Sequence, residues 1–148
     1  MDLNAYLDSG SPTESEFAIS FGSDTITLRL RLPDAQELQK AHKAATTTKK
    51  DRTGQVRSET DPGKLRDYLV EHVIVGWEGL TGAIAAKLAR RTPPNGDQAH
   101  LAQEPVEFTP DNCRALLKRV MGLEAELWLE VLRQDHERQE QEAAEKNG

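Results

Sequence analysis

The sequence has a single cysteine, few aromatic residues and no long apolar run. Its 148 residues include one cysteine, Cys113, so an internal disulfide is excluded and no cysteine pair is available for zinc. Aromatic residues make up 5% of the chain, and no apolar run approaches the roughly 20 residues that cross a bilayer. The N-terminus lacks the basic and apolar regions of a signal peptide. We therefore expect a protein of the reducing cytoplasm without membrane contact.

Charged residues are abundant instead. They make up 30% of the chain against 36% hydrophobic residues, and the net charge is -6. A chain of this length forms one domain with a modest core, because it buries roughly 68% of the surface that the unfolded chain exposes. The negative net charge disfavours non-specific binding to nucleic acid or to an anionic membrane. Nucleic acid therefore stays a minor alternative among the partners.

The ionisable residues form no recognisable catalytic or metal-binding pattern. Gly63-Lys64 is followed by Leu65, where a phosphate-binding loop needs Ser or Thr to hold magnesium. Cys113 falls on the predicted inward face of a helix, where cysteine behaves as a small core residue. The histidines are scattered along the chain as His42, His72, His100 and His136. We therefore expect no catalytic residue, no cofactor and no metal ion.

The N-terminal part of the chain predicts a flexible arm followed by a β-hairpin. Residues 1–16 are polar and contain Gly10 and Pro12, which leaves room for at most one helical turn. Within 17–32, apolar and polar residues alternate on both sides of Gly22-Ser23-Asp24, which is the pattern of a hairpin. A two-stranded sheet alone is only marginally stable in water. The hairpin must therefore pack on helices or pair with another chain.

Helical periodicity and capping residues predict five helices after the hairpin. The central helix has Asp61 as N-cap and Pro62 as first residue, and its apolar residues recur at three- and four-residue steps to Trp77. Thr109 and Pro110 mark another helix start in the same way. The predicted helices are 34–45, 62–77, 81–91, 110–121 and 123–134, with mobile loops at 46–60 and 92–104.

These elements predict a mainly α fold of the α+β class. The hairpin packs on a small helical bundle, and together they form a single globular domain at 17–134. Residues 135–148 are charged and have no apolar stripe, so they cannot add to the core. We expect them to form a charged C-terminal helical tail that projects from the domain.

The loop 46–60 is basic and has two interpretations. Its cations are Lys49, Lys50, Arg52 and Arg57. Such a run either recognises an acidic partner or is a solvated segment without a partner. If it binds, a nucleic-acid-binding regulator that also uses Arg90-Arg91 is one functional alternative.

Two tryptophans are candidates for either core packing or partner contact. Trp77 and Trp128 lie within apolar stripes, and tryptophan is enriched both in cores and at interfaces. Leu129 lies beside Trp128 but off the stripe, so its exposure would favour an interface. The candidate protein-interaction residues are Trp77, Leu80, Phe108, Trp128, Leu129 and Leu132.

Two segments together resemble the core of tail assembly chaperones from long-tailed bacteriophages and prophages. They are Val75-Gly76-Trp77-Glu78-Gly79-Leu80 and Pro105-Val106-Glu107-Phe108-Thr109-Pro110-Asp111-Asn112-Cys113-Arg114-Ala115-Leu116-Leu117. In that family a helix ends near a Trp-Glu-Gly-like turn, and a variable loop leads to a Pro-Val-x-Phe-Thr/Ser segment that opens the next helix. The end of the hairpin at Leu32-Pro33-Asp34 is similar as well, so the likeness spans about 17–132.

The resemblance implies a non-catalytic, mostly helical protein that self-associates and coats the tape-measure protein while the tail tube polymerises. Its implied partners are the tape-measure protein, further copies of itself and the tail-tube protein. Such a protein acts in the host cytoplasm and is absent from the mature virion. The basic loop 46–60 and the polar insertion 92–104 depart from the family pattern. A structural tail or neck protein that stays in the virion is the main alternative.

Overall fold

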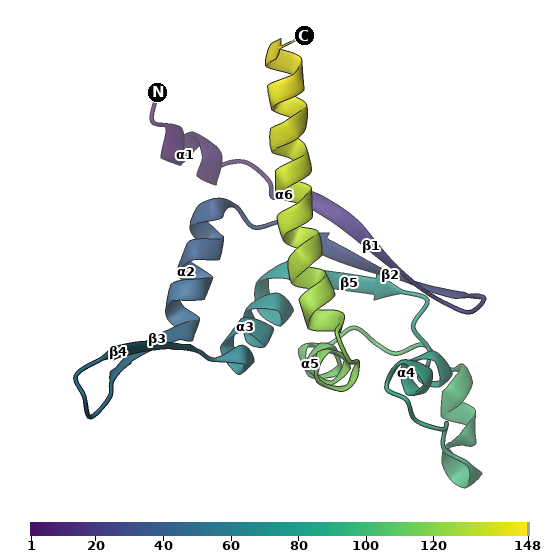
Figure 1. Ribbon diagram of the computed structural model, residues 1–148. Coiled ribbons are helices and arrows are strands. Elements are labelled where there is room, and N and C mark those ends of the chain that lie inside the picture. Colours follow the sequence, from purple (N-terminus) through teal and green to yellow (C-terminus); the bar gives the residue numbers. More distant parts are fainter. Residues whose placement is uncertain (148) are drawn as a thin grey trace. The chain divides into compact units, whose positions relative to one another are not determined.

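The computed structural model describes the backbone of residues 1–147 and the side chains of residues 1–133 and 143–145. His136 and most of the predicted tail at 135–148 lie outside the described side chains. The chain divides into two compact units, residues 1–16 with 29–75 and residues 17–28 with 76–148, so the predicted domain at 17–134 is divided between them. Helices and strands are both present, which confirms the predicted α+β class (Figure 1).

The predicted N-terminal hairpin is present and belongs to a three-stranded sheet. Its strands are β1 (Glu14–Phe21) and β2 (Asp24–Arg31), and β5 (Ile74–Glu78) joins them in the order β1-β2-β5. Ile26, Leu28 and Leu30 are buried at alternate positions of β2 because successive strand residues point to opposite faces. The hairpin begins three residues before the predicted start at 17, so the predicted arm 1–16 is wrong over its last residues.

The N-terminal arm contains one short helix of six residues, which is longer than the single turn that the sequence predicts at most. Helix α1 (Leu3–Asp8) is capped by Asp2, whose carboxylate accepts hydrogen bonds from the backbone N–H groups of Asn4 and Ala5. None of its residues is buried. The helix therefore adds nothing to the core of its own unit.

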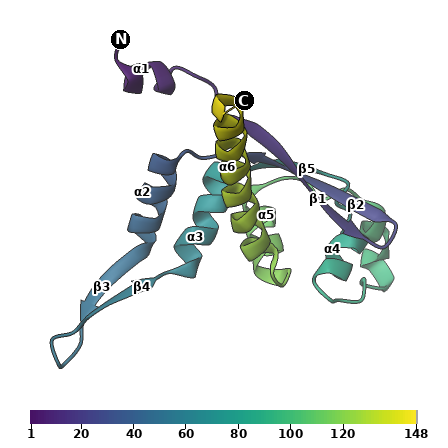
Figure 2. The ribbon, with the colours of Figure 1, turned by 45° about the horizontal axis from the view of Figure 1, so that its top comes forward.

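The segment predicted as a mobile loop at 46–60 is an ordered β-ribbon, so that prediction is wrong. Helix α2 (Ala35–Ala45) leads directly into β3 (Thr46–Lys50), which pairs antiparallel with β4 (Val56–Thr60). Threonine favours strands because its branched side chain is stiff at χ1, and five of the residues at 46–60 are threonine. Figure 2 shows the ribbon extending away from the ends of α2 and α3.

The predicted helix 62–77 is correct at its start and wrong at its end. Helix α3 (Pro62–Tyr68) is capped by Asp61 as expected, and a π-helix, η1 (Leu69–Val73), follows it. The chain then enters β5, which carries Trp77 on a strand in place of the predicted helix. Ile74 and Val75, the first two residues of β5, lose side-chain freedom in a helix and pack well in a strand, and β2 provides a neighbouring strand.

The remaining helices all belong to the second unit. They are α4 (Gly82–Leu88), the 3₁₀-helix η2 (Gly96–Gln103), α5 (Pro110–Arg119) and α6 (Leu123–Asn147). The hydroxyls of Thr81 and Thr109 cap α4 and α5. Helix α5 starts at the predicted residue and ends two residues before the predicted 121, whereas α4 starts one residue after the predicted 81 and ends three residues before the predicted 91. Residues 92–104 were expected to form a mobile loop, but most of them form η2, so that prediction is wrong over Gly96–Gln103. The predicted helix 123–134 and the helical tail after it are one continuous helix, α6.

Candidate protein-interaction site

Trp77 is fixed in the second unit by two contacts. Its indole N–H donates a hydrogen bond to the carbonyl oxygen of Val106 at 2.8 Å. Its ring meets the ring of Phe108 edge to face, with centroids 4.9 Å apart and planes at 88°. Edge-to-face aromatic pairs stabilise by about 0.5–1.5 kcal/mol beyond their buried area. Trp77 is half-buried and acts here as a packing residue.

Backbone hydrogen bonds hold the segment around Val106 against the end of β5. The Val106 N–H donates to the carbonyl oxygen of Leu80 at 2.8 Å, and Thr81 and Pro105 form an isolated β-bridge. Leu80 is only 3% exposed, so in this chain it is a core residue and not a surface anchor. The structure thus brings Trp77, Leu80 and Phe108 together as an internal joint between the two segments that carry the chaperone resemblance.

Gly79 and Gly82 lie next to this joint, and each allows another part of the backbone to approach closely. A Cβ added to Gly79 would lie 2.6 Å from the backbone oxygen of Thr25, and Gly79 has a φ of +83°. A Cβ on Gly82 would clash with the backbone oxygen of Leu101. The spacing of Gly76, Gly79 and Gly82, which fits no nucleotide-binding fingerprint, is therefore explained at its last two positions by close approach of the backbone.

Helix α6 presents apolar residues on two opposite sides. Leu123, Leu127 and Val131 recur at four-residue steps and are at most 2% exposed. At about 100° per residue, Ala125, Leu129 and Leu132 lie on the opposite side of the helix. Leu129 is 66% exposed and Leu132 is 54% exposed, and Ala125 is exposed as well. We call Ala125, Leu129 and Leu132 the α6 stripe.

Two kinds of residue lie next to the α6 stripe: an ion pair within the helix and the half-buried Trp128. Arg133 donates hydrogen bonds to Glu130 from Nη2 to Oε1 at 2.7 Å, from Nη2 to Oε2 at 2.9 Å and from Nε to Oε2 at 3.1 Å. Trp128 is half-buried at the boundary between the two faces. The structure therefore separates the predicted interface residues into the internal joint at Trp77 and an exposed pair, Leu129 and Leu132, on α6.

Cys113 is buried and His72 is exposed. Cys113 is fully buried, and this burial raises the pKa of its thiol to about 11, which keeps it neutral at physiological pH. The exposed His72 lies 3.9 Å from Glu71 and 5.1 Å, ring to ring, from Tyr68. Over the described residues, no three His, Cys, Asp or Glu side chains are grouped closely enough to hold a metal ion.

Two exposed apolar features were not among the predicted site residues. Met121 is 77% exposed at the turn before α6. Leu3, Tyr6 and Leu7 are 60–62% exposed on one face of α1, and their three- and four-residue spacing is the signal that could have identified them.

Comparison with known proteins identifies a family to which most of the chain is similar. No curated protein and no solved structure matches the chain. None of the described helices has the length and apolar character needed to cross a bilayer. The family described as YdaY prophage protein matches residues 33–148, which include both joint segments and α6. The chain is therefore a member of the YdaY prophage protein family.

Proposed function

We propose that this prophage protein is a non-catalytic tail assembly chaperone. It binds the tape-measure protein in the host cytoplasm while the tail tube polymerises, and it is absent from the finished virion. The prophage family and the resemblance of the two joint segments to tail assembly chaperones support this role. The observation that carries the proposal is the α6 stripe, because Leu129 and Leu132 are exposed on the side opposite the buried face of α6.

The stripe suits a helical partner. An apolar row at helical spacing packs against a second helix or into an apolar groove, and tape-measure proteins are long and helical. Full burial of one leucine side chain stabilises a complex by about 1.5–3 kcal/mol, and here Leu129 is 66% exposed and Leu132 is 54% exposed. One contact of this size is weak and reversible. Many copies along one tape-measure chain would give a stable coat that can still dissociate.

Co-expression with the tape-measure protein of the same prophage tests the proposal. We expect the two proteins to co-purify, and we expect the soluble fraction of the tape-measure protein to rise when this chain is present. Absence of a complex together with an unchanged soluble fraction would reject the chaperone role. A catalytic role would need a different site, because the proposed contact involves no reacting group.

The composition of purified particles separates the proposal from its main alternative. A structural tail or neck protein remains in the virion in a fixed ratio to the tail-tube protein. We expect mass spectrometry of purified particles to find the tail-tube protein without this chain. Its presence at a fixed ratio would replace the chaperone role with a structural one.

A further inference from the structure

The ribbon formed by β3 and β4, which we call the β3–β4 arm (46–60), is almost entirely exposed. Every residue of the arm except Thr46 and Asp51 is exposed to solvent. An uncovered two-stranded ribbon is marginally stable in water. Its order must therefore come from its turn and from its cross-strand pairs.

Asp51 organises the turn of the arm. Its Oδ1 accepts hydrogen bonds from the Thr53 N–H at 2.8 Å, the Thr53 hydroxyl at 2.6 Å and the Gln55 N–H at 2.9 Å. The Asp51 N–H donates to the carbonyl oxygen of Gln55 at 2.9 Å, and Gly54 takes a φ of +83°. The Asp51 carboxylate therefore accepts its hydrogen bonds from within the turn, and these bonds fix the backbone of the turn between β3 and β4.

The register of the arm places two cations opposite each other. Lys49 pairs directly with Arg57, so both side chains lie on the same face of the ribbon. Like charges in this position repel, and a counter-charge on the same face is Glu59, 3.6 Å from Lys49. Within the described part of the chain, no carboxylate pairs with Lys50, Arg52 or Arg57. An external anion between Lys49 and Arg57 would remove their repulsion.

The other face of the arm carries hydroxyl groups and a third cation, Lys50, which pairs with Val56. Thr46 pairs with Thr60 and Thr48 pairs with Ser58. The Thr46 hydroxyl already donates to the carbonyl oxygen of His42 at 2.8 Å. Ser and Thr hydroxyls, together with Lys and Arg, are the side chains that contact phosphate oxygens in protein–nucleic acid complexes.

The composition of the arm favours a nucleic acid over an acidic protein. Protein interfaces use aromatic and large apolar anchors, and the arm has Val56 as its single apolar side chain and no aromatic residue. Protein–nucleic acid interfaces are more polar and more positively charged. We infer that the β3–β4 arm binds the phosphodiester backbone of a nucleic acid through Lys49, Lys50, Arg52 and Arg57.

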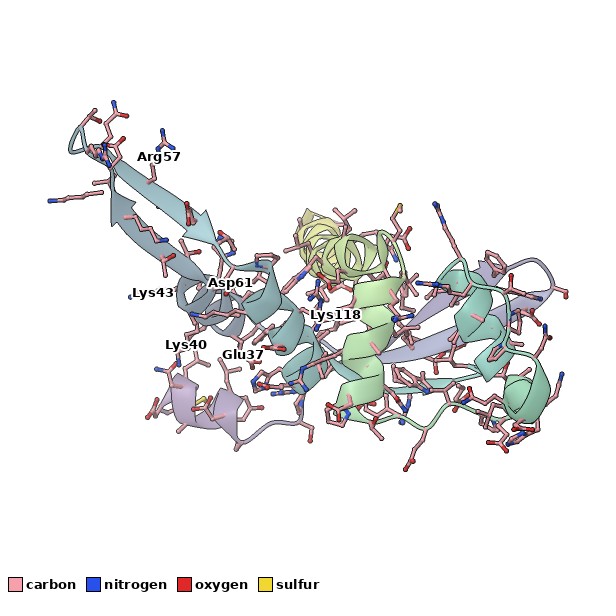
Figure 3. All side chains as sticks on the ribbon, turned by 90° about the horizontal axis from the view of Figure 1, so that it is seen from below. Glu37, Lys40, Lys43, Arg57, Asp61 and Lys118 are labelled. Atoms are coloured by element: carbon pink, nitrogen blue, oxygen red, sulfur yellow. The ribbon has the colours of Figure 1, made fainter. Side chains whose placement is uncertain are left out.

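The net charge of the chain does not prevent this contact. The arm has four cationic and two acidic residues, a net charge of +2, although the whole chain carries -6. A five-residue strand is about 16 Å long, whereas charges are screened beyond about 8 Å at physiological salt. Figure 3 shows Arg57 out on the ribbon, with Lys43 and Lys40 on α2 nearer the arm than the acidic Glu37. Lys43 and Lys40 thus add cations near the base of the arm, where the acidic Asp61 also lies.

Fluorescence anisotropy with a labelled DNA duplex of mixed sequence tests the inference. We expect the full chain to bind, with an affinity that falls steeply between about 50 and 200 mM NaCl. The double variant Lys49→Ala/Arg57→Ala should bind at least about tenfold more weakly, and its log-log salt slope should be smaller by about 2. The matched control Lys118→Ala/Arg119→Ala removes the same charge from α5 and should leave both quantities nearly unchanged.

Three results would overturn the inference. The first is no binding to the duplex at the lowest salt concentration. The second is an equal loss in both double variants, which would show that only total charge matters. The third is binding to poly-glutamate but not to the duplex, which would identify an acidic protein as the partner. Circular dichroism of each variant checks folding, and Lys49→Gln/Arg57→Gln repeats the test while keeping longer polar side chains.

Discussion

Trp77 and Phe108 meet edge to face at 4.9 Å, and this contact joins a strand of the sheet to the segment that opens α5. The hydrogen bond from Trp77 to the Val106 carbonyl, 2.8 Å long, holds the same two parts together. The two segments that resemble tail assembly chaperones are therefore one packed joint. Their role in this chain is to set the position of the chain between β5 and α5.

Replacing Trp77 by Phe should destabilise the protein by about 1–3 kcal/mol, because the substitution removes a part-buried hydrogen bond and part of the packed ring. Urea unfolding followed by circular dichroism measures the free energy. The exposed Leu129→Ala on α6 is the control and should stay within about 0.5 kcal/mol of the parent. An equal loss in both variants would show that Trp77 does not stabilise this joint.

Replacing Gly79 by Ala should be far more disruptive than replacing Gly22 by Ala. Both glycines have positive φ, which costs an alanine about 1–2 kcal/mol. At Gly79 the new Cβ would also lie 2.6 Å from the Thr25 oxygen, whereas nothing lies within 4 Å at Gly22. We therefore expect a much larger loss of unfolding free energy for Gly79→Ala, and equal losses would contradict the close backbone approach.

The stability of the protein should fall at alkaline pH partly through Cys113. Burial raises the pKa of this thiol from 9.0 to about 11 in the folded state, with a smaller opposing effect of Arg114. The stabilisation is complete below pH 9 and is lost as the pH rises toward 11. Urea unfolding at several pH values should show a steeper loss for the parent than for Cys113→Ala. Identical slopes would show that the thiol does not ionise on unfolding.

The order of the β3–β4 arm should fall at acid pH. The Thr53 hydroxyl bond to Asp51 is the largest cause that lowers the pKa of this carboxyl below its ordinary 3.8, and backbone bonds add to it. The stabilisation is therefore present above the ordinary value and is lost as the pH falls through the lower folded value. Amide NMR signals of Thr53 and Gln55 should report this loss, and Asp51→Ala should lack it. A pH-independent arm in the parent would contradict the turn geometry.

Local rules predicted the starts of helices and the first hairpin. Asp61 before Pro62 and Thr109 before Pro110 each specify a cap from neighbouring residues, and the structure has both helices where they predict them. The end of the central helix depends on a distant strand. The residues after Leu69 fit a helical stripe, but β2 offers a place in the sheet that is visible only in the fold.

The composition of residues 46–60 does not predict the β3–β4 arm, because the arm also depends on contacts that composition does not show. Threonine, lysine and a glycine at 46–60 resemble a solvated loop in composition, and the pairing of Lys49 with Arg57 is unfavourable on its own. Asp51 supplies the local hydrogen bonds that form the turn, and that geometry is not visible in composition. The exposure of Leu129 was predictable, because it lies off the stripe of buried residues on α6.

The most direct test of the proposed function is the affinity of full-length variants for the tape-measure protein of the same prophage. The double variant Leu129→Glu/Leu132→Glu places two charges on the α6 stripe, and the control Leu101→Glu places one charge at an exposed leucine of η2. We predict that the stripe variant loses binding by at least about tenfold while it stays folded, because charged groups resist burial in an apolar contact. The Leu101 variant should bind like the parent. Full affinity in the stripe variant would contradict the proposal that α6 holds the tape-measure protein.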